Sequence, residues 1–111
     1  MKEQKLAGLI GLAIRARQAA AGMDASRNMI RNGCCGVMLL DAETGSNTRK
    51  KIQELCERAD TPMRTIQPEL IGNASGKGHM LLSIKKGSFA DEILRITQEK
   101  GNQSLITPET D

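Results

Sequence analysis

Apolar side chains return at intervals of three and four residues along several stretches of the chain, which predicts amphipathic helices. The clearest pattern covers residues 3–16, and the same period predicts helices over residues 23–32 and 47–59. A short helix is expected over residues 68–74, and a last one begins at Ser88. Five helices therefore separate the other apolar segments of the chain.

These other apolar segments are shorter and are typical of strands. Residues 34–40 form a continuous small and apolar run, which suits a central strand that is buried on both faces. Residues 18–21 form a short connection or strand, and further short strands are predicted at residues 62–66 and 80–84. Because helices and strands alternate, the pattern predicts an α/β/α layered domain with helices on both faces of a small sheet.

Individual residues carry helix start and stop signals. Asp24 is a candidate N-cap of the second helix, and Gly33 is its stop signal. Pro68 fits the first position of the fourth helix. Ser88, with Asp91 three residues later, resembles a capping box at the start of the last helix. These signals predict the ends of the helices more closely than periodicity does.

The length of 111 residues fits one small domain with one modest core. Gly101 is expected to end the last helix, so we predict a single domain over residues 1–101. Residues 102–111 show no periodicity and are expected to form a disordered tail. No apolar run has the length of a membrane span and no signal-peptide pattern begins the chain, so a cytoplasmic protein without membrane contact is expected.

The residue types that carry most enzyme chemistry do not form a recognisable set. Cys34, Cys35 and Cys56 show neither the spacing of a disulfide framework nor that of a metal site. His79 is the single histidine, and a loop or strand-end position explains it without catalysis. We therefore expect no catalytic, metal or cofactor site, and a small enzyme that uses a cysteine is the least favoured function class.

The glycine-rich segment at residues 72–78 invites comparison with a nucleotide phosphate-binding loop. That loop needs four residues between its glycines and a Ser or Thr after its lysine. Here three residues lie between the glycines, and a glycine follows the lysine. The segment also joins a helix to a strand, which reverses the order found in P-loop NTPases. Nucleotide binding is therefore not expected.

The formal net charge of +3 is too small to diagnose a nucleic-acid partner, but the charges are unevenly distributed. Residues 1–35 carry six basic side chains against two acidic ones, whereas acidic residues dominate from residue 87 onward. Phe89 is the single aromatic residue, so no Tyr or Trp is available for base stacking. Any RNA contact would therefore rest on Arg, Lys, amide and backbone groups.

Residues 15–33 combine features that suit the binding of a polyanion. A conformationally permissive glycine precedes a short helix whose polar side offers basic and amide groups, and two arginines lie just before it. A turn, a solvated helix face and a cap would explain the same residues without any ligand. The candidate binding residues of this stretch are Arg15, Arg17, Gly22, Asp24, Arg27, Asn28 and Arg31.

Residues 46–51 place three cations at the expected start of the third helix, where the macrodipole is already positive. An anion bound at this helix N-terminus would compensate for the unfavourable arrangement. A solvated charge run, relieved by a pair between Lys50 and Glu54, is the alternative explanation. The candidate binding residues here are Asn47, Arg49, Lys50 and Lys51.

Short motifs along the chain combine into a specific order. They are Arg15-Ala16, Gly22, Ile30-Arg31-Asn32-Gly33, Leu39-Leu40, Asn47-Thr48-Arg49-Lys50-Lys51, Cys56, Pro62, Ile71-Gly72-Asn73-Ala74-Ser75-Gly76-Lys77 and Gly87-Ser88-Phe89-Ala90. Over residues 4–97 their order and spacing resemble the YlxQ-type bacterial proteins. These belong to the kink-turn RNA-binding ribosomal protein superfamily, with the archaeal L-seven-Ae type and the L-thirty-e type.

The resemblance implies a three-layer α/β/α sandwich with a mixed four-stranded sheet. It also implies an RNA surface made by the start of the second helix and two neighbouring loops. In kink-turn binders a glycine is followed two, three and six positions later by Asn, Glu and Lys, which contact sheared G·A pairs and nearby phosphates. Gly22 is followed instead by Asp24, Ala25 and Asn28, so the frame is kept and its chemistry is altered.

The third part of the family's surface maps to residues 76–80. Lys77 is expected to contact phosphate, and His79 or Met80 can lie against a base face. The sequence as a whole predicts a non-enzymatic binder of structured, kink-turn-like RNA. Ribosomal RNA and a ribosomal or translation-factor protein are the expected partners. The alternative is a protein-interaction adaptor that keeps the fold and has lost standard kink-turn recognition.

Overall fold

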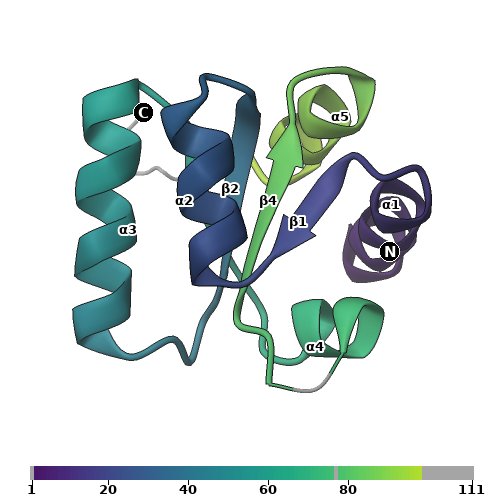
Figure 1. Cartoon of the computed structure of the whole chain (residues 1–111). Coiled ribbons are helices and arrows are strands. Elements are labelled where there is room, and N and C mark those ends of the chain that lie inside the picture. Colours follow the sequence, from purple (N-terminus) through teal and green to yellow (C-terminus); the bar gives the residue numbers. More distant parts are fainter. Residues whose placement is uncertain (1, 77, 99–111) are drawn as a thin grey trace, which may run out of the picture.

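The computed structural model describes residues 2–76 and 78–98 of the chain (Figure 1). Its helices are α1 (Lys2–Arg15), α2 (Met23–Arg31), α3 (Ser46–Ala59), α4 (Leu70–Ser75) and α5 (Ser88–Ile96). Its strands are β1 (Ala19–Ala21), β2 (Cys35–Asp41), β3 (Met63–Ile66) and β4 (Leu81–Lys85). The expected tail at 102–111 and the helix stop at Gly101 lie outside the described residues.

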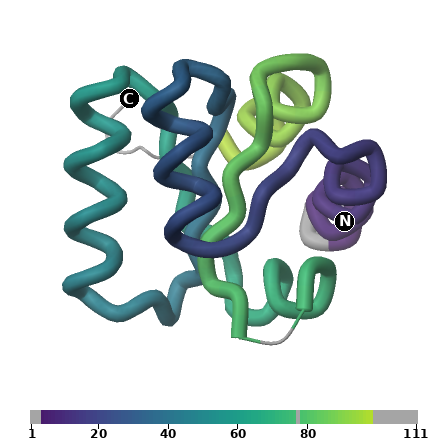
Figure 2. The backbone as a smooth tube through the Cα atoms, in the orientation of Figure 1, coloured from purple at the N-terminus to yellow at the C-terminus, as the bar shows by residue number. Residues whose placement is uncertain are grey.

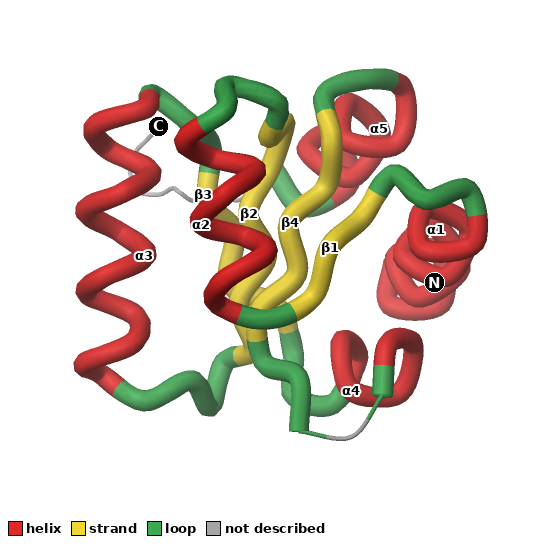
Figure 3. Tube along the Cα trace, viewed as in Figure 1, coloured by secondary structure: helices red, strands yellow, loops and turns green. Residues whose placement is uncertain are grey.

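The four strands form one mixed sheet in the order β1-β4-β2-β3 (Figure 3). β2 runs parallel to β3 and antiparallel to β4, and β1 runs antiparallel to β4. The prediction that the apolar run after Gly33 forms a central strand is confirmed, because β2 lies between β4 and β3. The mixed four-stranded sheet implied by the resemblance is confirmed as well.

Helices cover both faces of this sheet, with α1, α4 and α5 on one face and α2 and α3 on the other (Figures 1 and 2). Side chains of β2 alternate between the two layers. Val37 and Leu39 pack in the core under α1, α4 and α5, whereas Met38 and Leu40 pack under α2 and α3. All four are fully buried, which confirms the three-layer α/β/α sandwich.

One close approach fixes the position of α5 against the sheet. A Cβ atom at Gly36 would lie 2.6 Å from the Cβ atom of Ala90 and 2.9 Å from the Cα atom of Lys86. Only glycine fits this position without a shift of the backbone. The glycines of α1 are different, because a Cβ atom at Gly8 or Gly11 would meet nothing within 4 Å. No close contact of the described chain therefore requires a glycine at either position.

The predicted helix starts were displaced, because glycines occupy the N-cap positions. Gly22 is the N-cap of α2 and Gly87 that of α5, and neither position has a side-chain cap. The N-cap prediction for Asp24 and the capping-box prediction for Ser88 are therefore wrong. Glycine supplies the unusual backbone angles at both helix starts, and the polar residues then fall inside the first turn.

Two further helix ends correct or confirm the sequence signals. Pro68 is not the first residue of α4, because Glu69 adopts a left-handed conformation with φ of 74° and the helix begins at Leu70. The stop at Gly33 is confirmed, since its φ is also 74° and its N–H donates to Ile30 O at 3.0 Å. This positive-φ glycine turns the chain from α2 into β2.

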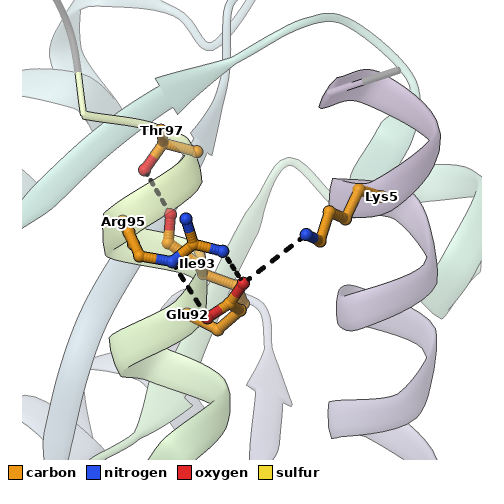
Figure 4. Close-up of polar contacts among 5 residues, drawn as sticks. All are labelled: Lys5, Glu92, Ile93, Arg95 and Thr97. Atoms are coloured by element: carbon orange, nitrogen blue, oxygen red, sulfur yellow. Dashed lines mark hydrogen bonds and ion pairs between the residues drawn. The ribbon is translucent and has the colours of Figure 1, made fainter.

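The last helix ends at Ile96, well before the glycine that was expected to stop it. Thr97 is its C-cap residue, and the Thr97 hydroxyl donates to Ile93 O at 2.6 Å (Figure 4). On the same helix Glu92 accepts hydrogen bonds from Arg95 and forms an ion pair with Lys5 of α1 at 3.8 Å. The ion pair connects α5 to α1.

Candidate nucleic-acid interface

Three segments that are distant in sequence meet at one end of the sheet. The end of β1 and the end of β2 both lie beside the start of β4, because both strands pair with it antiparallel. The Gly22 N–H donates to Leu81 O at 3.0 Å, and the Asp41 N–H donates to Met80 O at 2.9 Å. We call this end, formed by residues 22–25, 42–49 and 78–80, the loop edge. It lies at the bottom of Figure 1.

Gly22 has a backbone conformation that other residues rarely adopt. Its φ of 93° and ψ of 168° lie in a region that is essentially restricted to glycine. The chain thus uses the conformational freedom of glycine at this position. A Cβ atom built here would meet nothing within 4 Å, so no neighbouring atom of the described chain requires its absence. The backbone angles explain the glycine, and the open space permits a ligand to approach the backbone.

Two helix N-termini face the loop edge without side-chain caps. The N-cap residues Gly22 and Gly45 have no side-chain oxygen that could accept the first backbone N–H groups of α2 and α3. The first backbone N–H groups of a helix have no intrahelical acceptor, and they carry the positive end of the macrodipole. Asp24 lies in the first turn of α2, whereas α3 has no acidic residue in its first turn. The edge therefore presents donors that favour an anion.

Asp41, at the end of β2, fixes the backbone of this edge. One of its carboxylate oxygens accepts the Glu43 N–H at 2.7 Å and the other accepts the Glu69 N–H at 2.9 Å. The Thr44 hydroxyl donates to Asp41 O at 2.7 Å. Asp41 is only 4% exposed, so a buried carboxylate links the loop before α3 to the start of α4. Periodicity placed Asp41 in a turn and did not indicate this role.

Arg49 belongs to the same scaffold. Its guanidinium donates to Thr65 Oγ1 at 2.8 Å, to Asp41 O at 3.3 Å and to Ala42 O at 3.5 Å. These bonds hold α3 against β3 and against the loop that precedes α3. The sequence indicated only a binding role for Arg49, and the contact with Thr65, sixteen positions away, adds a structural one.

The charge arrangement of α3 is milder than expected. Because the helix begins at Ser46, Arg49 is its fourth residue and Lys50 and Lys51 follow in the second turn. The prediction of three cations in the first turn is therefore wrong, and the unfavourable interaction with the dipole is correspondingly weaker. Asn47 lies in the first turn and is exposed, as are both lysines. These three side chains are available to a partner.

His79 lies at the loop edge and is bound to the end of α4. Its Nδ1 atom lies 3.1 Å from Ser75 O and 3.1 Å from Ser75 Oγ, while the Ser75 hydroxyl donates to Ile71 O. The side chain is half-buried, with its ring near Gly76. This arrangement matches the strand-end position that needs no catalytic role. The neighbouring candidate Lys77 lies outside the described residues.

Arg15 and Arg17 are not brought together with the loop edge. They flank the turn between α1 and β1, where the Lys85 N–H at the end of β4 donates to Gln18 O at 2.7 Å. This turn lies at the opposite end of the sheet from Gly22 (Figure 1). Both arginines are exposed, and Arg17 has a φ of 60°. One continuous surface over residues 15–33 is therefore not formed.

The altered recognition triplet is accessible along the start of α2. Asp24, Ala25 and Asn28 are all exposed. Arg27 is half-buried, and its guanidinium lies 3.7 Å from the Asp24 carboxylate, whose side chain is 95% exposed. Arg31 is exposed in the last turn of the same helix. The helix thus presents one acidic, one amide and two basic side chains to solvent or to a partner.

Cys35 and Cys56 are buried, whereas Cys34 is exposed. Burial raises the pKa of the Cys35 thiol and that of the Cys56 thiol to about 11 each. Both thiols are thus almost entirely protonated at neutral pH, whereas the nucleophilic form is the thiolate. The polar contacts of His79 are with Ser75. Within residues 2–76 and 78–98, no group of three or more His, Cys, Asp or Glu side chains is arranged to hold a metal ion.

Comparisons with known proteins show a similar sequence and similar folds. The RNA-binding protein YlxQ of Bacillus subtilis is 29% identical over 90 residues, which cover 79% of this chain and 90% of that protein. No protein-family profile matches the chain. Among the described helices, none is long and apolar enough to cross a membrane.

Solved structures share the fold. A protein of unknown function from Bacillus halodurans superposes with a TM-score of 0.80 and 25% identity, over 86% of this chain and 98% of its own. The 15.5kD RNA binding protein of Giardia lamblia superposes with a TM-score of 0.71, over 86% of this chain and 87% of its own. At 14% identity that likeness shows the fold alone. With the similarity to YlxQ, these findings confirm the resemblance of the chain to the YlxQ-type bacterial proteins.

Proposed function

We propose that this protein is a non-enzymatic binder of structured RNA and that the loop edge is its recognition surface. The observation that carries the proposal is the backbone of Gly22, whose glycine-only conformation opens onto free space beside the uncapped start of α2. The second uncapped helix start, that of α3, lies at the same edge. Together they offer backbone donors and positive dipole ends to phosphate groups.

The similarity to an RNA-binding protein of Bacillus subtilis supports the same partner class. We further propose that the RNA is kink-turn-like and associated with the ribosome or translation, in the cytoplasm. Asp24, Ala25 and Asn28 offer fewer donors and less charge than the Asn, Glu and Lys of the superfamily. We therefore expect the affinity for a standard kink-turn to be modest and to depend strongly on phosphate contacts.

The test is a fluorescence titration of the wild-type protein with three RNAs of equal length. These are a kink-turn, a straight duplex and a single strand, each measured at several salt concentrations. We expect the folded RNAs to bind more tightly than the single strand, with the kink-turn highest, and affinity to fall steeply with salt. Failure to bind any folded RNA at low salt would contradict the proposal and favour the protein-interaction adaptor.

A further inference from the structure

A groove lined with basic residues lies between α2 and α3, on the face of the sheet away from α1. The two helices lie side by side, and both begin at the loop edge (Figures 1 and 2). The groove has a volume of about 200 Å³. Its lining consists of Arg27, Arg31, Lys51, Glu54, Leu55 and Arg58. Four cations thus surround one carboxylate and one apolar side chain.

The positive charge of this groove is largely uncompensated by the protein itself. Within the described part of the chain, Arg31, Lys51 and Arg58 form no ion pair within 4.0 Å, and neither does Glu54. Arg27 is paired with Asp24 at 3.7 Å, but that carboxylate is almost fully exposed. Four cations and the single carboxylate of Glu54 leave an excess of positive charge in the groove, so the groove favours an anionic occupant.

Helix dipoles explain part of this arrangement. Arg31 and Arg58 each lie in the last turn of their helix, where a cation interacts favourably with the macrodipole. Lys51 lies in the second turn of α3 and gains nothing from that interaction. The dipole also does not explain why the basic side chains of both helices line the same groove. The convergence is the feature that points to a ligand.

The length of the groove fits a stretch of nucleic-acid backbone. The seven residue steps from Lys51 to Arg58 rise by roughly 10 Å along α3. A nucleic-acid strand carries one phosphate per about 3.4 Å of helix axis, so roughly three phosphates can lie along this distance. The groove begins in the second turns of α2 and α3, just beyond the loop edge, and runs toward the C-terminal ends of both helices. An RNA held at the loop edge can therefore continue into it.

We propose that the α2–α3 groove binds the phosphodiester backbone of one stem of the RNA whose folded part lies on the loop edge. This inference rests on the proposed function and adds a second contact region to it. The contact is electrostatic and independent of base sequence, because contacts of Arg and Lys side chains with phosphate oxygens carry no sequence information. Arg58, which the sequence did not single out, becomes a binding residue.

The experiment compares two triple variants that remove the same charge. The groove variant carries Arg31→Gln, Lys51→Gln and Arg58→Gln, and the control variant carries Lys5→Gln, Lys85→Gln and Lys86→Gln, all exposed positions away from the groove. Both are titrated with kink-turn RNAs that have a long or a truncated stem, at several salt concentrations. Thermal unfolding verifies that each variant is folded.

For the wild type we expect a higher affinity for the long stem than for the truncated one. The groove variant should lose this preference, and the slope of log affinity against log salt should fall by roughly two to three units. The control variant should keep the preference. Equal stem preference and equal slopes in the groove variant and the control would overturn the groove proposal while leaving the loop edge as the RNA site. A wild type that binds no folded RNA would overturn both proposals.

Discussion

The two helical layers of this protein differ in how their charged side chains are paired. In the layer of α1 and α5, Glu92 is surrounded by Arg95 and Lys5, so the charges neutralise one another (Figure 4). In the layer of α2 and α3, Arg31 and Arg58 line a groove and form no ion pair among the described residues. Each layer buries an apolar core under its helices. The difference at the surface is the basis of our proposal that the α2–α3 layer, with the loop edge, binds an anion.

The largest effect is expected where backbone geometry and recognition coincide, at Gly22. Gly22→Val should lower the free energy of unfolding by about 1–3 kcal/mol, because a β-branched residue does not adopt a φ of 93° with a ψ of 168°. RNA affinity should be lost even under conditions where the variant is folded. Denaturant unfolding and RNA titration measure the two effects. Normal stability together with normal affinity would remove Gly22 from the site.

Restoring the superfamily residues at the altered triplet should strengthen recognition of a kink-turn. The triple change Asp24→Asn, Ala25→Glu and Asn28→Lys should raise the affinity for a standard kink-turn by about 1–3 kcal/mol, the scale of one good recognition pair. It should also steepen the salt dependence by roughly one unit through the added lysine. Loss of the exposed Asp24 carboxylate frees Arg27 as well. A straight duplex serves as the control RNA, and an equal gain for both RNAs would contradict specific recognition.

Arg49 and Lys50 are neighbours on α3 with different surroundings. Arg49 bonds to neighbouring elements, whereas Lys50 is exposed. Arg49→Gln should lower the free energy of unfolding by about 1 kcal/mol, because the guanidinium bonds to Asp41 O and Thr65 Oγ1 are lost. Lys50→Gln is the matched control and should leave stability unchanged within about 0.5 kcal/mol. Thermal unfolding of both variants checks this. Equal stability of the two variants would show that the Arg49 contacts contribute nothing measurable.

The smallest effect is expected in the layer of α1 and α5, at Glu92. The pKa of Glu92 lies below its usual range, chiefly because Arg95 donates hydrogen bonds to its carboxylate. A carboxylate with a lowered folded-state pKa contributes stability above its unfolded pKa and loses it as the pH falls through the folded value. Glu92→Gln should therefore slightly reduce stability at neutral pH, with a difference that fades in acid and in high salt. RNA affinity should not change. A clear loss of RNA affinity would contradict the proposal that RNA binds the α2–α3 layer and not the layer of α1 and α5.

The sequence predicted the fold well where apolar patterns were long. The run that became β2 was identified as the central strand because it is apolar on both faces, and Val37 and Met38 do pack in opposite layers. The helix starts were predicted less well, because Gly22 and Gly87 serve as N-caps through their backbone angles and not through a side chain. In the sequence, the only sign of such backbone angles is the glycine itself.

The candidate site could be predicted only in part. Gly22, Asp24 and Asn28 were candidates from the pattern of residues 15–33, and the resemblance added the spacing that makes them, with Ala25, a recognition triplet. Arg15 and Arg17 were joined to them by sequence proximity and lie at the other end of the sheet. Arg58 was missed because its neighbour Arg31 is on another helix, and no periodic pattern connects the two. Contacts between elements depend on packing, which spacing along the chain does not report.

Backbone amide shifts in ¹H–¹⁵N spectra, recorded while a kink-turn RNA is titrated into the labelled protein, test most directly whether the loop edge is the RNA site. We predict changes at residues 22–31, at the start of α3 and at residues 78–80, with smaller changes along the α2–α3 groove. The amide chemical shifts of α1 and α5 should not change. Changes concentrated on α1, α5 or the turn at Arg17, with the loop edge unaffected, would contradict the placement of the RNA on the loop edge.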